Sequence, residues 1–219
     1  MELLIYLTKF CNYKCKYCFK RDQGNSKILS KKLLNLKLNQ VNNIIIKNNI
    51  KELDITIRGG EYSLINETIP LFHDIINWCN NLKLKINITT HSNYSGKLEY
   101  FEKLFKVLDS SKTQITFNFS NHSEYNNILK KAFQEKIIKI KKLSNLINFR
   151  LAFDNYSETI FSLTKDSFHK ELLSMPIIRT IPNKVFFTSK EFKVLLDDSL
   201  NLTINNKIFK LRKENDKNR

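Results

Sequence analysis

Three of the four cysteines in this chain lie close together in the segment CNYKCKYCF. Three residues separate Cys11 from Cys15, and two separate Cys15 from Cys18. This clustering favours a metal site, because disulfides among three neighbours would leave one cysteine unpaired. Three thiolates on one loop can hold three irons of a cubane iron–sulfur cluster and leave the fourth iron without a protein ligand. An open coordination position is where a metal centre does chemistry.

A structural zinc site is the alternative interpretation of these cysteines. Its fourth ligand would be His73, His91 or a more distant residue. Structural zinc sites usually show a second pair of ligands further along the chain, and no such pair follows Cys18. The spacing therefore favours an iron–sulfur cluster.

A second segment whose residues could take part in chemistry is IRGGEYSL, at the end of an expected strand. The chain has only four glycines, so the adjacent pair Gly59 and Gly60 is informative. Two glycines let the backbone approach a ligand closely, and Glu61 offers an anionic acceptor to an ammonium group. A simple tight turn is the structural alternative.

Together these two segments resemble the radical SAM superfamily, whose CxxxCxΦC loop follows the first barrel strand. The resemblance implies that Cys11, Cys15 and Cys18 ligate a [4Fe-4S] cluster and carry its redox chemistry. Tyr17 fills the aromatic position Φ, which in the family lies against the adenine of S-adenosylmethionine (SAM).

The glycine segment is similar to the family's GGEP motif, which ends the second strand and holds the amino group of SAM. The resemblance thus implies that Gly59, Gly60 and Glu61 bind this cofactor. Tyr62 stands where the family usually has proline, which changes the stiffness of the loop and leaves its acceptors in place.

Further matches to the family lie after the third, fourth and fifth strands. TTHSN stands where many members have a Thr-Asn-Gly run, so Thr90 and Ser92 are expected to face the cofactor, while His91 is either a substrate-facing acid or base or a polar rim residue. The strand-four region resembles the peptide-maturing and molybdopterin-type branch, with Ser120 near SAM. Arg150 matches an arginine that pairs with the methionyl carboxylate, and an arginine on a barrel-facing strand needs an anion.

The elements that must position these residues alternate between short β-branched or aromatic runs and longer amphipathic runs. Such alternation predicts a parallel sheet with right-handed crossovers. Six βα units predict an α/β fold, an open, partial (β/α)6 TIM-like barrel with a short C-terminal β-containing extension. Reactive groups in parallel barrels gather at the C-terminal ends of the strands. The expected strands are LLIYLT, LDITIRGG, KINITTH, QITFNFS, INFRLAF and IIRTI.

The alternation of strand-like and helix-like runs changes after Pro182. Residues 1–182 are therefore expected to form the barrel, and 183–219 an extension with a basic tail. The extension contains short strands around an expected turn at Asn205 and Asn206. It is expected to cover the open side of the barrel or to bind the substrate. No cysteine follows Cys79, which lies on an apolar helical face, so an auxiliary-cluster domain is not expected and Cys79 is a core residue.

The net charge of +16 and the pI of about 9.6 suggest an acidic partner. Most of the basic residues are lysines at solvated helix positions, and arginine is scarce, which argues against nucleic acid as the partner. The resemblance implies a reducing flavodoxin or ferredoxin, and both are acidic. No apolar run is long enough to span a membrane, and the N-terminus lacks signal-peptide features, so a cytoplasmic protein is expected.

The resemblance implies that the cluster reductively cleaves SAM to a 5′-deoxyadenosyl radical, which abstracts hydrogen from a substrate. The leading hypothesis is a radical SAM enzyme, with oxidoreductase or transferase-type radical chemistry, acting on a nucleotide, sugar or other metabolite. The alternatives are a peptide-modifying radical SAM enzyme, a glycyl-radical activase, and a non-enzymatic metal-stabilised module that binds nucleic acid.

Overall fold

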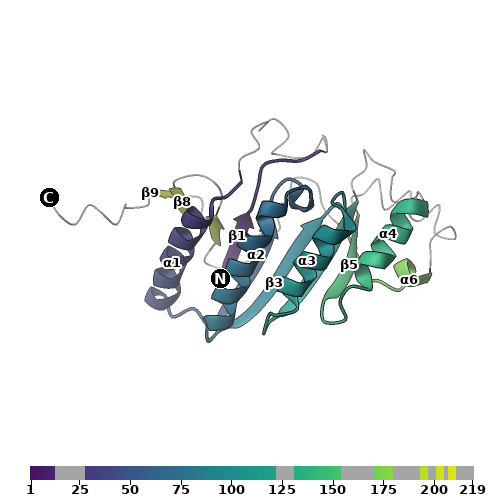
Figure 1. The fold of residues 1–219 in the computed structure, drawn as a ribbon. Coiled ribbons are helices and arrows are strands. Elements are labelled where there is room, and N and C mark those ends of the chain that lie inside the picture. The colour runs from purple at the N-terminus through teal and green to yellow at the C-terminus, as the bar shows by residue number, and fades with distance from the viewer. Residues whose placement is uncertain are drawn as a thin grey trace.

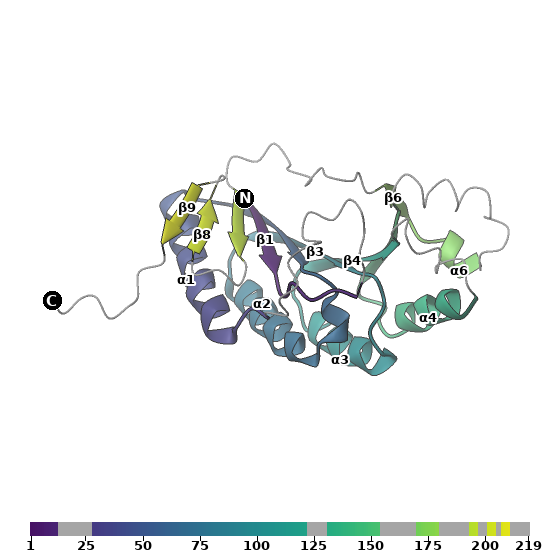
Figure 2. The same cartoon turned by 90° about the horizontal axis from the view of Figure 1, so that it is seen from above.

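The structure is a computed structural model that describes residues 1–12, 28–121, 131–153, 170–179, 193–196, 201–204 and 207–210. Within these residues one sheet has the strand order β6-β5-β4-β3-β2-β1-β7-β8-β9. Helices α1 to α4 lie along one face of this sheet (Figures 1 and 2). The strands are β1 (Glu2–Tyr6), β2 (Glu52–Arg58), β3 (Lys85–Ser92), β4 (Gln114–Asn121), β5 (Asn148–Phe153), β6 (Ile177–Arg179), β7 (Lys193–Leu196), β8 (Asn201–Ile204) and β9 (Lys207–Lys210). The helices are α1 (Lys31–Lys47), α2 (Ile69–Asn81), α3 (Leu98–Leu108), α4 (Lys131–Lys141) and α6 (Lys170–Leu173).

Strands β1 to β6 pair in parallel in sequence order, which confirms the predicted βα repeat. The sheet does not close on itself, so the fold is the predicted partial TIM-like barrel. Strand β7 pairs in parallel with β1, while β8 and β9 continue the sheet in antiparallel pairs. The extension therefore contains strands, as expected, and it adds them beside β1. Its expected turn residues, Asn205 and Asn206, lie outside the described residues.

Local signals explain where the helices begin. The sequence predicts a helix capped by Ser30, and Ser30 does cap α1, because its hydroxyl accepts a hydrogen bond from the Leu33 amide at 3.2 Å. The sequence also predicts a helix that opens at Asn66, but α2 begins later, at Ile69. Two single 3₁₀ turns, Tyr62–Leu64 and Asn66–Thr68, precede α2, whose first turn contains a proline. Proline fits there because the first helical amides have no intrahelical acceptor.

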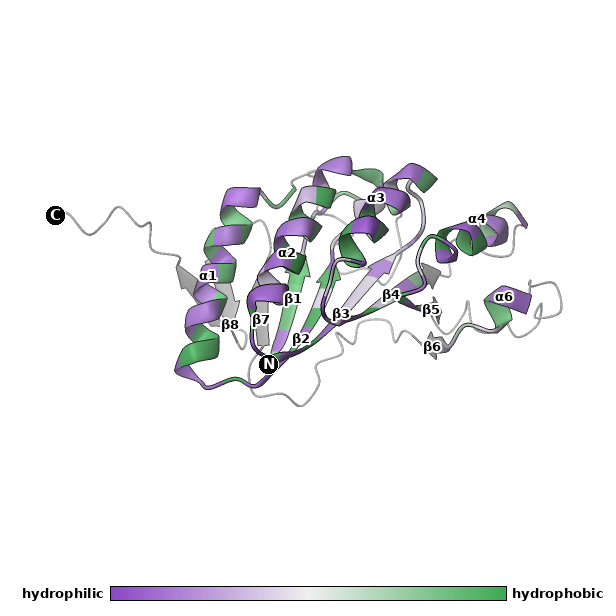
Figure 3. Ribbon diagram, turned by 60° about the horizontal axis from the view of Figure 1, so that its bottom comes forward, coloured by the Kyte–Doolittle hydropathy of each residue, from purple (hydrophilic) through white to green (hydrophobic). Residues whose placement is uncertain are grey.

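Successive residues of each strand alternate between two faces of the sheet. The face toward α1–α4 is apolar and buried, and Figure 3 shows β1 and β2 as largely hydrophobic behind helices with hydrophilic outer sides. Aromatic rings connect this face to α3: the ring of Phe105 lies 5.3 Å from that of Phe117 and 5.6 Å from that of Phe149, centroid to centroid. We call the opposite face of β2–β5 the inner face. The inner face is mostly polar: Asp54, Thr56, Arg58, Asn87, Thr89, His91, Thr116, Asn118 and Arg150.

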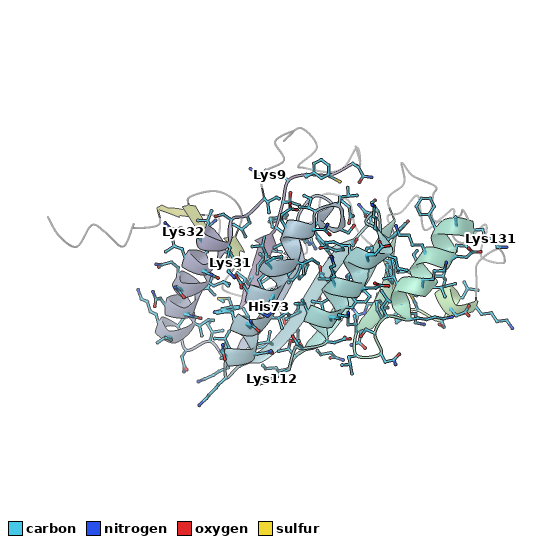
Figure 4. The ribbon with its side chains drawn as sticks, viewed as in Figure 1. Lys9, Lys31, Lys32, His73, Lys112 and Lys131 are labelled. Atoms are coloured by element: carbon cyan, nitrogen blue, oxygen red, sulfur yellow. The ribbon has the colours of Figure 1, made fainter. Side chains whose placement is uncertain are left out.

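Several lysines are exposed on the helical layer, as predicted, although Lys37 of α1 is fully buried. The exposed ones include Lys31 and Lys32 of α1 and Lys131 of α4, which Figure 4 labels. One of them, Lys31, pairs with Asp74 of α2 at 3.1 Å. In the described part of the chain, every helix is too short or too polar to cross a bilayer.

Candidate functional site

The segment after β2 lies directly against the start of the cysteine loop. The Gly60 amide donates to the carbonyl of Thr8 at 2.8 Å, and the Glu61 amide donates to the carbonyl of Phe10 at 2.7 Å. Cys11 follows Phe10 and is exposed. The fold therefore brings the first cysteine and the GGE segment together at the C-terminal ends of β1 and β2, as the barrel hypothesis requires.

The two glycines are needed for this contact between backbones. Gly59 has a φ of +145°, and a Cβ on it would lie 2.7 Å from the carbonyl oxygen of Thr8. A Cβ on Gly60 would lie 1.8 Å from the carbonyl oxygen of Phe10 and 3.0 Å from the Cβ of Cys11. The sequence suggested that the glycines admit a ligand. The structure shows that they admit the backbone of Thr8 and Phe10 at the start of the cysteine loop, and their role toward a ligand stays a prediction.

Glu61 is a buried carboxylate that joins the ends of β2 and β3. Its Oε1 accepts hydrogen bonds from the hydroxyl of Ser92 at 2.7 Å and from the hydroxyl and amide of Ser63. Its Oε2 accepts from the Asn93 amide at 2.5 Å. Burial raises the pKa of Glu61, and these donors oppose the rise by stabilising the charged form. This network fixes one acidic group next to the C-terminal ends of β2 and β3.

The segment after β3 completes this network. The Gly96 amide donates to the Ser63 hydroxyl at 2.8 Å, and a Cβ on Gly96 would lie 2.1 Å from the Ser63 carbonyl oxygen. Lys136 of α4 donates to the Gly96 carbonyl at 2.5 Å. Burial lowers the pKa of Lys136, while the charge of Glu61 acts in the opposite direction. Sequence reasoning missed Ser63, Asn93 and Lys136, because no motif connects them to Glu61.

Two residues that were expected to face a cofactor point toward the helices instead. Thr90 is fully buried on the helix-facing side, where its hydroxyl contacts the Tyr62 hydroxyl at 2.8 Å and the Ile57 carbonyl at 3.2 Å. Ser92 is also buried and donates to Glu61. We therefore assign both hydroxyls a positioning role. Tyr62, in place of the family's proline, packs edge-on against Phe72 of α2, with ring centroids 5.2 Å apart.

Arg150 and His91 lie on the inner face of the sheet. Asn118 is in register with His91 on one side and with Arg150 on the other. The Asn118 amide nitrogen lies 3.2 Å from the Nε2 of His91. Arg150 is exposed and makes no ion pair with any described residue. This placement fits both the expected anion partner of Arg150 and a substrate-facing His91.

Other predicted residues fall outside this network. Cys15, Tyr17 and Cys18 lie outside the described residues, and for Ser120 the structure gives only its backbone place in β4. Cys79 is buried in α2, and burial raises its pKa to about 12, in agreement with a core residue. His73 is exposed on α2 and contacts Asn77 at 3.1 Å, so it lies apart from the Glu61 network (Figure 4). Among the described residues, no three His, Cys, Asp or Glu side chains lie close enough to hold a metal ion.

Sequence comparison gives no relative, since no family model and no curated protein match the chain. Solved structures do match its fold. The structure of anSMEcpe with bound AdoMet (SAM) and Kp18Cys peptide has a TM-score of 0.55 at 18% identity and covers 87% of this chain and 53% of that one. HydG, a maturase of the [FeFe]-hydrogenase, has a TM-score of 0.51 at 16% identity and covers 86% of this chain and 44% of that one. The chain spans about half the length of these proteins and shares their barrel fold.

Proposed function

We propose that the chain is a radical SAM enzyme that binds a [4Fe-4S] cluster and SAM at the C-terminal ends of β1–β5. The observation that supports this most strongly is the close contact between the GGE segment and Cys11. Two motifs that occurred in the sequence by chance would not be expected to lie in contact in the structure. Here the two glycines are required by the loop that carries the cysteines. The shared fold with anSMEcpe, whose structure contains AdoMet, adds support.

Each proposed ligand has a chemical reason. Thiolates of Cys11, Cys15 and Cys18 would hold three irons and leave one for SAM. When bound, the cluster would supply an electron that cleaves SAM to methionine and a 5′-deoxyadenosyl radical. The chain's own contribution is orientation: Tyr17 would lie against the adenine, and Arg150 would pair with the carboxylate of SAM. Ser120 would approach the ribose or the carboxylate.

Glu61 would act on the ammonium group of SAM as a fixed negative charge. Its Oε2 accepts one hydrogen bond from a described residue, that of the Asn93 amide, and a carboxylate oxygen has room for a second. Gly59 and Gly60 keep this carboxylate next to the cysteine loop. These residues fit a zwitterionic ligand whose two charged groups lie close together.

We propose a small molecule, such as a nucleotide, a sugar or another metabolite, as the leading class of substrate. A second candidate, peptide modification, is favoured by the fold match to anSMEcpe with its bound Kp18Cys peptide. Because the chain covers 53% of that protein, the parts of anSMEcpe without a counterpart here weaken this transfer. A peptide substrate and a metabolite are distinguished by the products of the reconstituted enzyme.

We also propose an acidic flavodoxin or ferredoxin as the electron donor. The lysine-rich outer surface would steer such a partner by long-range attraction. Steering of this kind weakens as salt rises, because the Debye length falls from about 10 Å at 0.1 M to about 3 Å at 1 M. Reduction rates that stay flat across this range would count against the proposal.

The decisive experiment is anaerobic reconstitution followed by iron, sulfide and zinc analysis. We expect four irons and four sulfides per chain, in line with one cubane cluster. Dithionite and SAM should then release 5′-deoxyadenosine. Cys15→Ala should abolish this release, whereas the matched control Cys79→Ala should retain it, because Cys79 is a core residue. Zinc in place of iron, or equal release by the Cys15 variant, would refute the proposal.

A further inference from the structure

Arg58 is the last residue of β2 and lies immediately before Gly59. Its neighbour Ile57 is fully buried on the helix-facing side, so Arg58 lies on the inner face. The Nε of Arg58 is buried and has no hydrogen-bond partner among the described residues. A guanidinium keeps its charge at any physiological pH, so a buried and unpartnered Nε–H calls for an acceptor.

A second unpartnered polar atom lies on the same face. Asn118 is only 2% exposed, and its Oδ1 has no hydrogen-bond partner in the described part of the chain, while its Nδ2 lies near His91. A buried amide with one free end is uncommon in a folded protein. One donor and one acceptor near the same strand ends indicate a polar site that the described residues do not satisfy.

The strand register places these residues in one row. Ile57 pairs with Thr90, so the next residues, Arg58 and His91, are neighbours on the inner face. His91 pairs with Asn118, and Asn118 pairs with Arg150. Neighbouring strands are about 4.8 Å apart, so Arg58 and Arg150 lie roughly 14 Å from each other along the sheet. We call this row, Arg58, His91, Asn118 and Arg150, the inner row.

The inner row carries two permanent positive charges and no carboxylate. Two acidic residues of β2 lie on the inner face, Glu52 and Asp54. Asp54, four positions before Arg58, accepts a hydrogen bond from Asn87 at 2.8 Å, and Glu52 pairs with Lys85 at 3.1 Å. Neither arginine forms an ion pair with a described residue. The separation of the two guanidinium groups suits two anions held side by side better than one.

We propose that Arg58 binds an anionic group of the substrate, a phosphate or a carboxylate, while the Oδ1 of Asn118, which is an acceptor, takes a hydrogen bond from a hydroxyl or amine of the same substrate. This assignment rests on the proposed function, in which Arg150 serves the carboxylate of SAM. Arg58 then holds the substrate on the neighbouring part of the inner face. An arginine fork binds both kinds of oxyanion with two parallel hydrogen bonds, so the shared chemistry is a planar or tetrahedral oxyanion.

The test uses the full chain and two probes, inorganic phosphate and glutarate, in separate calorimetric titrations. We expect saturable binding of at least one probe, weakened at least tenfold by Arg58→Gln and less by Arg58→Lys. The matched control is Lys85→Gln, which removes a cation at the other end of the same face, where Lys85 pairs with Glu52 at 3.1 Å. This control should bind the probe as the wild type does. The probe that binds identifies the class of anion.

Three outcomes would overturn the inference. Neither probe binds the wild type; the Arg58→Gln variant, shown by its melting curve to be folded, binds equally well; or SAM displaces the probe from the reconstituted enzyme, which would assign Arg58 to the cofactor. The proposed function fails separately. A wild type that binds an anion through Arg58 but releases no 5′-deoxyadenosine would refute the radical SAM assignment and leave the anion site intact.

Discussion

The two faces of strands β2–β5 differ in whether the hydrogen bonds of their buried polar groups are satisfied. On the helix-facing side of these strands the buried hydroxyls of Thr90 and Ser92 are satisfied, by contacts to Tyr62, Ile57 and Glu61. On the inner face, Arg58 and Asn118 each keep a buried atom without a partner among the described residues. An unpartnered buried polar group lowers stability. The inner face therefore retains polar atoms that do not stabilise the fold. The comparison teaches that the helix-facing side holds the fold together, whereas the inner face keeps polar atoms that its described neighbours do not satisfy.

The largest expected effect is a difference in stability loss between a substitution on the helix-facing side and one on the inner face. Phe117→Ala should lower the free energy of unfolding by about 4 kcal/mol, because it opens a cavity among the rings of Phe101, Phe105 and Phe149. The adjacent inner-face change, Asn118→Ala, should cost about 1 kcal/mol or less. Urea unfolding followed by circular dichroism measures both values. Equal losses would remove the distinction between the faces.

Glu61 lies just after the C-terminal end of β2. Its removal should lower the stability of the protein as well as its activity. Glu61→Ala leaves the Ser92 hydroxyl and the Asn93 amide without their acceptor, so we expect a loss of about 3 kcal/mol. The same denaturation experiment measures this loss. A variant as stable as the wild type would show that the network does not hold the strand ends together.

Arg150→Ala should leave stability unchanged and weaken the binding of SAM. A charge-assisted contact contributes about 1.5–3 kcal/mol, which corresponds to roughly one to two decades in affinity. Anaerobic equilibrium dialysis of the reconstituted enzyme with labelled SAM measures the change. Iron content serves as the control, because the cluster should remain. Unaltered SAM affinity would remove Arg150 from the site.

The raised pKa of Glu61 predicts a pH dependence. Because folding raises this pKa, its ionisation opposes folding, and the unfavourable contribution grows as the pH rises through the raised value. Binding of the SAM ammonium needs the charged form, so SAM affinity should fall when the pH drops through the same range. Titrations at several pH values test this. Glu61→Gln, which cannot titrate, should show a flatter profile, and an identical profile would exclude Glu61 as the source.

The smallest effect tests the reassignment of Thr90. Thr90→Val keeps the shape and removes the hydroxyl that contacts Tyr62, so stability should fall by about 1 kcal/mol. SAM affinity should stay within twofold of the wild type. A tenfold loss of affinity in a stable variant would return Thr90 to the cofactor site.

Much of the fold was predictable because it depends on local pattern. Ser30 caps α1 as its residue type indicates, and the alternating runs gave the parallel sheet. The start of α2 was misplaced because the turns before it are 3₁₀, which apolar periodicity does not distinguish from α-helix. Thr90 was placed on the wrong face, since the end of a strand by itself does not indicate which alternate residues face the helices.

The sequence by itself determined which chemical groups are present: three closely spaced thiols, two adjacent glycines and a glutamate at a strand end. These depend only on residue identity and spacing. Only the tertiary structure decided what the groups touch, because such contacts join residues far apart in the chain. Ser92, which binds Glu61, is 31 positions from it, and the backbone that Gly60 must accommodate belongs to a different strand's loop. The strand register likewise brings Arg58 and Asn118 into one row, which no local pattern reveals.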